Sequence, residues 1–136
     1  MKDIRRKKIF LISPVNTSNP ENYKMVKRYV AKLEKKGHIV HWPIRDTDQN
    51  DPIGINICDT NLKKIFEWAD EIHIYYLAES RGIHFDIGAL YLVIRILKYK
   101  KKVVFINKKD FRKELYGKTS GKSFIKVIYY LEKHSK

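Results

Sequence analysis

Short apolar runs alternate with segments of helical periodicity along this chain, and that alternation restricts the fold more than any other feature. The apolar runs are rich in β-branched and aromatic residues, which is typical of strands covered on both faces. Strands are expected over residues 7–13, 38–42, 71–77 and 102–106. Helices are expected between Asn19 and Gly37 and over residues 58–68, 85–98 and 123–133, with a loop over residues 45–54. Strands that alternate with helices in this way form a parallel sheet.

The expected fold is therefore α/β, a three-layer α/β/α sandwich of the Rossmann or flavodoxin type. Its parallel sheet has four to five strands in the order 2-1-3-4, with any fifth strand after the fourth. At 136 residues the chain has the length of a single domain, residues 1–136, without an internal repeat or linker. The order of the sheet reverses between the first and third strands, where such sheets bind their ligands.

Composition points to an ordered protein in a reducing compartment. The 43% hydrophobic content argues against disorder, and Cys58, the single cysteine, excludes an internal disulfide. Residues 1–8 are too charged for a signal peptide, and no apolar stretch approaches the roughly 18 residues of a membrane span. We expect a cytoplasmic protein with no membrane partner.

The net charge of +14 is unevenly distributed. Residues 95–136 contain 14 Lys and Arg side chains and three acidic ones, whereas the first 94 residues carry a net charge of only +3. A basic region attracts anionic ligands. The alternative is that these lysines are ordinary solvent-exposed residues of a protein from a lysine-rich proteome. The lysines of residues 98–102 and 108–113 are not interleaved with an aromatic stacking pattern, so nucleic acid ranks low among the expected partners.

Polar residues follow the first and third strands, whose carboxyl ends meet at the switch point. Ser80 and Gly82 come just before a predicted helix and offer a hydroxyl and backbone N–H groups for a phosphate or sugar. Asp86 lies in the first turn of that predicted helix and is the candidate catalytic residue. The alternative is that Asp86 only complements the helix dipole.

Three segments together resemble the nucleoside 2-deoxyribosyltransferase superfamily, including its deoxynucleoside-monophosphate N-glycosidase branch. They are the strand Ile-Phe-Leu-Ile-Ser-Pro over residues 9–14, the helix and strand over residues 62–72, and the turn Ser-x-Gly-x-x-Phe-Asp-Ile-Gly-Ala over residues 80–89. The resemblance covers about residues 7–107, and the third segment is the most specific.

The resemblance implies that a carboxylate attacks C1′ of a 2′-deoxynucleoside and that the base departs. Asp86 falls where the family has its catalytic glutamate. The family's helix aspartate aligns near Leu62, and Asp59, one turn earlier, is the nearest available carboxylate. Ser80 matches a phosphate-contacting hydroxyl. The expected substrate-binding residues from the first loop and the neighbourhood of Asp86 are Ser13, Pro14, Val15, Asn16, Gly82 and His84.

No cofactor or metal is expected. The segment Gly117–Ser123 is one residue too short between its glycines for a P-loop, and residues 46–51 lack the glycine of a calcium loop. The resemblance also implies a homodimer or larger oligomer. The helix over residues 85–98, apolar nearly all round and expected to be well buried, is its predicted interface.

Three hypotheses follow from the sequence. The first is an enzyme that cleaves or transfers at the N-glycosidic bond of a deoxynucleoside or its monophosphate, with Asp86 as nucleophile. The second is a non-catalytic domain that binds or senses a nucleotide. The third is a basic protein that contacts nucleic acid through residues 95–136.

Overall fold

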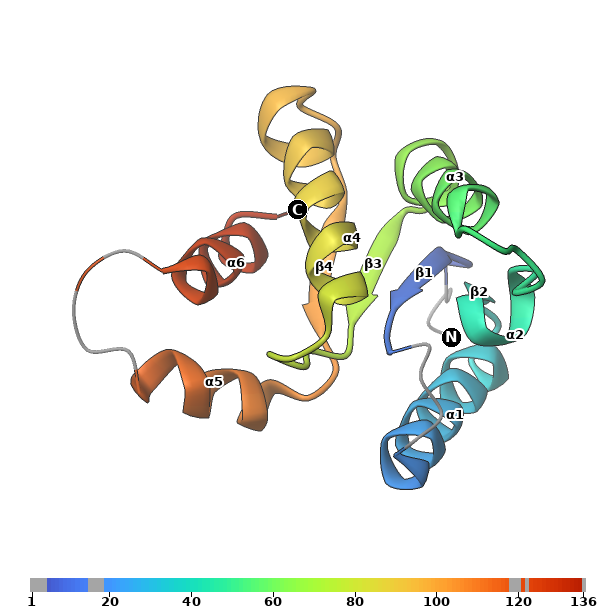
Figure 1. Ribbon diagram of the computed structural model, residues 1–136, viewed down its shortest axis with the longest axis horizontal. Coiled ribbons are helices and arrows are strands. Elements are labelled where there is room, and N and C mark those ends of the chain that lie inside the picture. Colours follow the sequence, from blue (N-terminus) through green and yellow to red (C-terminus); the bar gives the residue numbers. More distant parts are fainter. Residues whose placement is uncertain (1–4, 15–18, 118–120, 122, 136) are drawn as a thin grey trace.

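The computed structural model describes residues 5–14, 19–117, 121 and 123–135. Its centre is a parallel sheet in the order β2-β1-β3-β4 (Figure 1). The strands are β1 (Lys8–Ile12), β2 (Ile39–His41), β3 (Glu71–Ile74) and β4 (Lys102–Phe105). The predicted α/β class, parallel pairing and strand order are confirmed.

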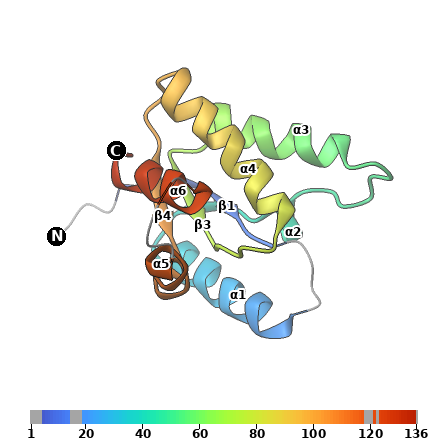
Figure 2. The same cartoon turned by 60° about the vertical axis from the view of Figure 1, so that its left-hand side comes forward.

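Helices cover both faces of the sheet, as expected for a three-layer sandwich (Figures 1 and 2). The helices are α1 (Pro20–Lys35), α2 (Pro43–Asp46), α3 (Ile55–Lys63), α4 (Arg81–Tyr91), α5 (Lys108–Gly117) and α6 (Phe124–Lys133). Two π-helical segments, η1 (Lys64–Trp68) and η2 (Leu92–Ile96), continue α3 and α4. Among the described residues, no helix has both the length and the apolar character to cross a membrane.

Burial on both faces of the central strands explains their continuous apolar sequence. In β1, Phe10 and Ile12 pack into the core beneath α4 and α6, while Ile9 and Leu11 pack into the core beneath α1. Successive side chains of a strand point to opposite faces, so a strand between two helical layers needs apolar residues at every position. This is why β1 could be recognised from its sequence.

The helix predicted over residues 85–98 begins earlier, at Arg81, and is less buried than expected. Ser80 is its N-cap residue, because its Oγ accepts the backbone N–H of Ile83 at 3.3 Å. Gly82 therefore lies inside the first helical turn. Apolar side chains on the outer side are exposed to solvent, with exposed fractions of 56% for Phe85 and 62% for Ile96.

The sequence did not predict α5 or α2, and it assigned Arg45 and Asp46 of α2 to a loop. In α5 only Phe111 is buried, stacked on Phe105 of β4 with ring centroids 4.1 Å apart. One apolar anchor in a highly charged segment gives no helical periodicity. In α2, Pro43 occupies the first turn, where its missing N–H costs nothing.

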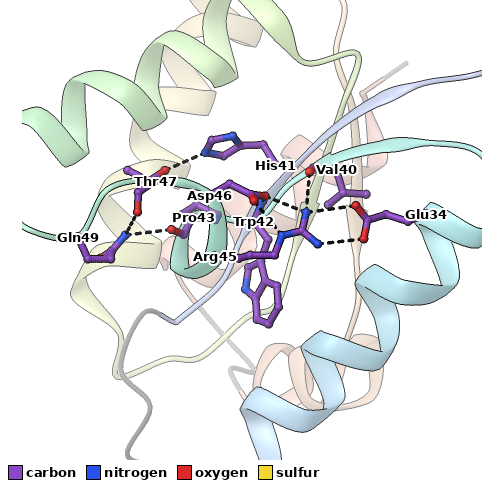
Figure 3. Close-up of polar contacts among 9 residues, drawn as sticks. All are labelled: Glu34, Val40, His41, Trp42, Pro43, Arg45, Asp46, Thr47 and Gln49. Carbon is purple, nitrogen blue, oxygen red and sulfur yellow. Dashed lines mark hydrogen bonds and ion pairs between the residues drawn. The ribbon is translucent and has the colours of Figure 1, made fainter.

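The turn after β2 is fixed by a polar cluster around Arg45 (Figure 3). Its guanidinium donates two hydrogen bonds to the Glu34 carboxylate on α1, at 2.9 and 3.2 Å, and a third to the Val40 carbonyl at 3.1 Å. It also donates to Asp46, whose carboxylate accepts the Trp42 backbone N–H at 2.8 Å. These contacts join the end of α1 to the segment that follows β2.

Asn107 closes the carboxyl end of the sheet between β3 and β4. Its Oδ1 accepts the backbone N–H of Tyr76 at 2.8 Å, and its Nδ2 donates to the Tyr76 carbonyl at 2.7 Å. Both residues are buried. The side chain thus replaces a strand partner where β4 has ended.

We expect Asn107→Ala to lower the free energy of unfolding by about 2–4 kcal/mol, because two buried backbone groups lose their partners. Urea denaturation measures this change. Asn56→Ala, at an exposed position of α3, is the control and should change stability by less than about 0.5 kcal/mol. Equal losses for the two variants would contradict the role of the Asn107 bridge.

Candidate functional site

A cavity of about 650 Å³ opens beside the carboxyl ends of β1 and β3. Five segments line it: the turn after β1, the start of α1, the middle of α3, the turn after β3 and the start of α4. The order of the sheet reverses at this point, so the cavity occupies the ligand-binding position of open α/β sheets.

The structure brings together five of the residues predicted for the site. Ser13 and Pro14 line the cavity from the β1 side, and Ser80, Gly82 and Asp86 line it from α4. They come from segments almost 70 residues apart in the chain. Their common location follows from the parallel pairing of β1 with β3.

Two predicted residues lie elsewhere. Asp59 is exposed on α3 and is not among the residues that line the cavity. His84 lines a separate groove between α4 and α6; its Nδ1 donates to the Ser80 carbonyl at 2.7 Å, and its ring meets that of Tyr76 edge-on. Val15 and Asn16 fall outside the described residues.

The Asp86 carboxylate is the chemically distinctive group of the cavity. Burial raises its pKa from 3.8 to about 7. Within the described part of the chain, neither an ion pair nor a hydrogen bond to another side chain offsets this desolvation. Close to neutral pH the group therefore exchanges between the neutral acid and the carboxylate.

The observed start of α4 weakens the dipole explanation for Asp86. The first turn of α4 contains no acidic residue, because the helix begins at Arg81 and Asp86 lies in its second turn. Stabilisation by the helix dipole falls off within the first turn. The position of Asp86 is better explained by the cavity that it faces.

Two hydroxyl groups accompany Asp86. Ser80 Oγ already accepts the Ile83 N–H as the N-cap of α4, so its proton is free to be donated to a ligand. Ser13 Oγ is buried and has no hydrogen-bond partner among the described residues. An unsatisfied buried hydroxyl is costly, but this oxygen is closed off from solvent in the structure, so Ser13 lines the cavity with its other atoms.

Asn61 is a lining residue that sequence reasoning missed. It is buried on α3, and its Oδ1 accepts a hydrogen bond of 2.8 Å from Thr47 Oγ1. Thr47 Oγ1 in turn accepts from His41 Nε2 at 2.8 Å (Figure 3). The buried chain of hydrogen bonds leaves the Asn61 amide nitrogen as a donor for the cavity.

The structure places other residues of α3 in the cavity than the one selected from the sequence. Asp59 was selected as the carboxylate nearest to Leu62, whereas the α3 residues that line the cavity are Ile57, Cys58 and Asn61. The Asn61 side chain is an amide and not a carboxylate.

The cavity also contains charged residues that were not predicted. Glu79 and Arg81 lie in its lining, and both are exposed. No cluster of three or more His, Cys, Asp or Glu side chains suited to a metal ion occurs in the part of the chain that the structure describes. Asp86, Ser13, Ser80 and Asn61 are less exposed lining residues than Glu79 and Arg81.

Comparison with models of known protein families found no match, and comparisons with curated proteins and with solved structures found none either.

Asp86→Asn is expected to stabilise the protein in a pH-dependent way. The folded-state pKa of about 7 lies above the ordinary value of 3.8, so the folded protein binds more protons than the unfolded chain between these values. Stability therefore falls as pH rises through this window and stays low above it. At pH 8 the free energy of unfolding of the variant should be about 1–3 kcal/mol higher than that of the wild type. This is less than the full pKa shift of Asp86 implies, because the side chain is partly solvated.

Thermal and urea denaturation at pH 4 and pH 8 measure this effect. The gain should vanish near pH 4, where the wild-type carboxyl is protonated in the folded state. Asp59→Asn, at an exposed position, is the matched control and should show no such dependence. A gain of equal size at both pH values would contradict a desolvated Asp86.

Proposed function

We propose that this protein binds a 2′-deoxynucleoside or its monophosphate and cleaves or transfers at the N-glycosidic bond, with Asp86 as nucleophile. The observation that carries the proposal is the partly buried Asp86 carboxylate in a cavity with Ser13 and Ser80 at the switch point of the sheet. A cavity of about 650 Å³ has the size of a nucleotide site. The resemblance of residues 80–89 to the deoxyribosyltransferases supports the same assignment.

In the proposed reaction, an Asp86 oxygen forms a bond to C1′ while the C1′–N bond breaks. The base departs with the electron pair of that bond and takes up a proton. Water or a second base then attacks C1′ and releases the Asp86 carboxylate. Only the ionised form of Asp86 can act as nucleophile, so the pKa near 7 sets the active fraction.

A specific observation favours a second candidate, a domain that binds a nucleotide without turning it over. The α3 position that faces the cavity holds Asn61, and an amide has no acidic proton to give to a departing base. The remaining carboxylate of the lining, Glu79, is exposed. Binding then requires only the hydroxyls, the Asn61 amide and an apolar surface for the base.

Incubation with deoxynucleosides and their 5′-monophosphates, followed by chromatography, tests the enzymatic proposal. The wild-type protein should release free base, and Asp86→Asn should slow the release about 100-fold or more. The rate should rise with pH and level off above about pH 7, as Asp86 ionises. Asp59→Asn, which lies outside the cavity, should release base at the wild-type rate.

Base release that is unaffected by Asp86→Asn would rule out the nucleophile assignment. Calorimetric binding of a nucleotide without base release would favour the binding domain instead. The absence of both binding and release would overturn the two candidates together.

We propose further that a second copy of the chain covers the groove between α4 and α6. This groove, of about 490 Å³, is lined mainly by apolar side chains. Phe124 at its rim is 81% exposed, and Leu92, which follows α4 on η2, is 49% exposed. Apolar surfaces of this kind mark interaction sites, and the resemblance implies a homo-oligomer.

Light scattering coupled to size-exclusion chromatography measures the state of assembly. The wild-type protein is expected to be a dimer or larger, and Phe124→Ser with Leu92→Ser should convert it to a monomer. Ile53→Ser, at a position that is 77% exposed and distant from the groove in sequence, is the control. A wild-type monomer at concentrations near 100 µM would contradict the proposal.

A further inference from the structure

The amino edge of the sheet, opposite the cavity, gathers basic side chains from three separate segments of the chain. The strands begin at this edge, where α1 leads into β2 and η2 leads into β4. The basic side chains that come together, called here the basic edge, are Arg5, Arg6, Lys8, Lys35, Lys36, Lys98, Lys100 and Lys102. All eight residues are exposed.

The strand register places these residues close to one another. Lys8 pairs with Ile39, three residues after Lys36, and Glu71 of β3 pairs with Lys102 of β4. Neighbouring strands lie about 4.8 Å apart, so the four strand starts span about 15 Å. Lys8 and Lys102 begin two of the four strands, and Lys36 lies three residues before a third, so these lysines lie along the same edge of the sheet.

The acidic residues at this edge do not neutralise it. Glu71 is buried and engaged by Lys7 and His73, and these hydrogen bonds hold its pKa below the usual value although burial acts to raise it. The Asp70 carboxylate accepts the backbone N–H of Lys8 at 2.9 Å. None of the eight basic side chains forms an ion pair within the described residues.

The basic edge differs from the region that the sequence suggested. Residues 95–136 do not form one surface, because Lys108, Lys109 and Lys113 lie on α5, which follows the carboxyl end of β4. The basic edge instead joins residues 98–102 to residues 5–8 from the start of the chain. Its charge density is therefore higher than either segment has alone.

An exposed aromatic ring lies within this charged surface. Tyr99, between Lys98 and Lys100, is 46% exposed. Its ring packs edge-to-face against Phe66 of η1 with centroids 4.8 Å apart, which fixes its orientation. A fixed aromatic ring flanked by lysines is the combination with which proteins hold single-stranded nucleic acids, where a base stacks on the ring and the cations contact phosphates.

We propose that the basic edge binds single-stranded nucleic acid, with Lys36, Lys100 and Lys102 contacting phosphates and Tyr99 stacking on a base. The site is separate from the cavity of Asp86 and does not depend on the function proposed for it. Because the contacts are to the backbone and to one base face, binding is expected to show little sequence preference.

Fluorescence anisotropy with a labelled 20-nucleotide oligothymidine tests this proposal. The triple variant Lys36→Glu, Lys100→Glu and Lys102→Glu should bind at least 10-fold more weakly. The slope of its log Kd against log salt concentration should be smaller by about 2, because three phosphate contacts are lost. The matched control Lys108→Glu, Lys109→Glu and Lys113→Glu makes the same change in net charge on α5. This control should lose less than about threefold.

Tyr99→Ala should weaken binding of the oligothymidine about fivefold or more and leave binding of a 20-base-pair duplex nearly unchanged. Circular dichroism establishes that each variant is folded. Equal losses of affinity in the two triple variants would show that only the long-range electrostatic field matters, and would overturn the proposed binding site. Binding to vesicles containing 30% phosphatidylserine without binding to oligothymidine would also overturn it. The absence of any binding at 100 mM salt would do the same.

Discussion

The pairing of β1 with β3 is the interaction on which the rest of the structure depends. Ile9 to Ile12 pair in parallel with Glu71 to Ile74, and the Tyr75 N–H donates to the Ile12 carbonyl at 2.8 Å just beyond β3. Each of these strands is buried on both faces. Because β2 and β4 extend the sheet in opposite directions from this pair, the loops after β1 and β3 diverge and leave the cavity between them.

The sequence predicted the strands well because the central strands are uniformly apolar, a pattern that few other structures require. It predicted the start of α4 poorly, since Ser80 and Gly82 suit a turn as well as a capped helical turn. It could not predict η1, because π-turns have no strong sequence signal. Asp59 was selected from α3 as the carboxylate nearest to Leu62, but the α3 residues that line the cavity are Ile57, Cys58 and Asn61.

A chain of buried polar side chains compensates the charge of Glu71 in β3. Tyr29 donates to His73 Nδ1, and His73 Nε2 donates to Glu71, which also contacts Lys7. Burial lowers the pKa of His73 against the opposing effect of Glu71, and burial raises that of Tyr29 to about 12. The Glu71 charge is therefore compensated by Lys7 and His73, and it does not pair with the exposed lysines of the basic edge.

The Asp86 side chain is difficult to explain by stability alone. A desolvated carboxyl without a partner destabilises the fold at neutral pH, and an asparagine of the same shape would avoid this cost. Buried carboxyls with a structural role are normally paired, as Glu71 is with Lys7 and His73. A carboxylate that is left unpaired in a cavity at the switch point of the sheet is most simply explained by a ligand that supplies the missing contacts.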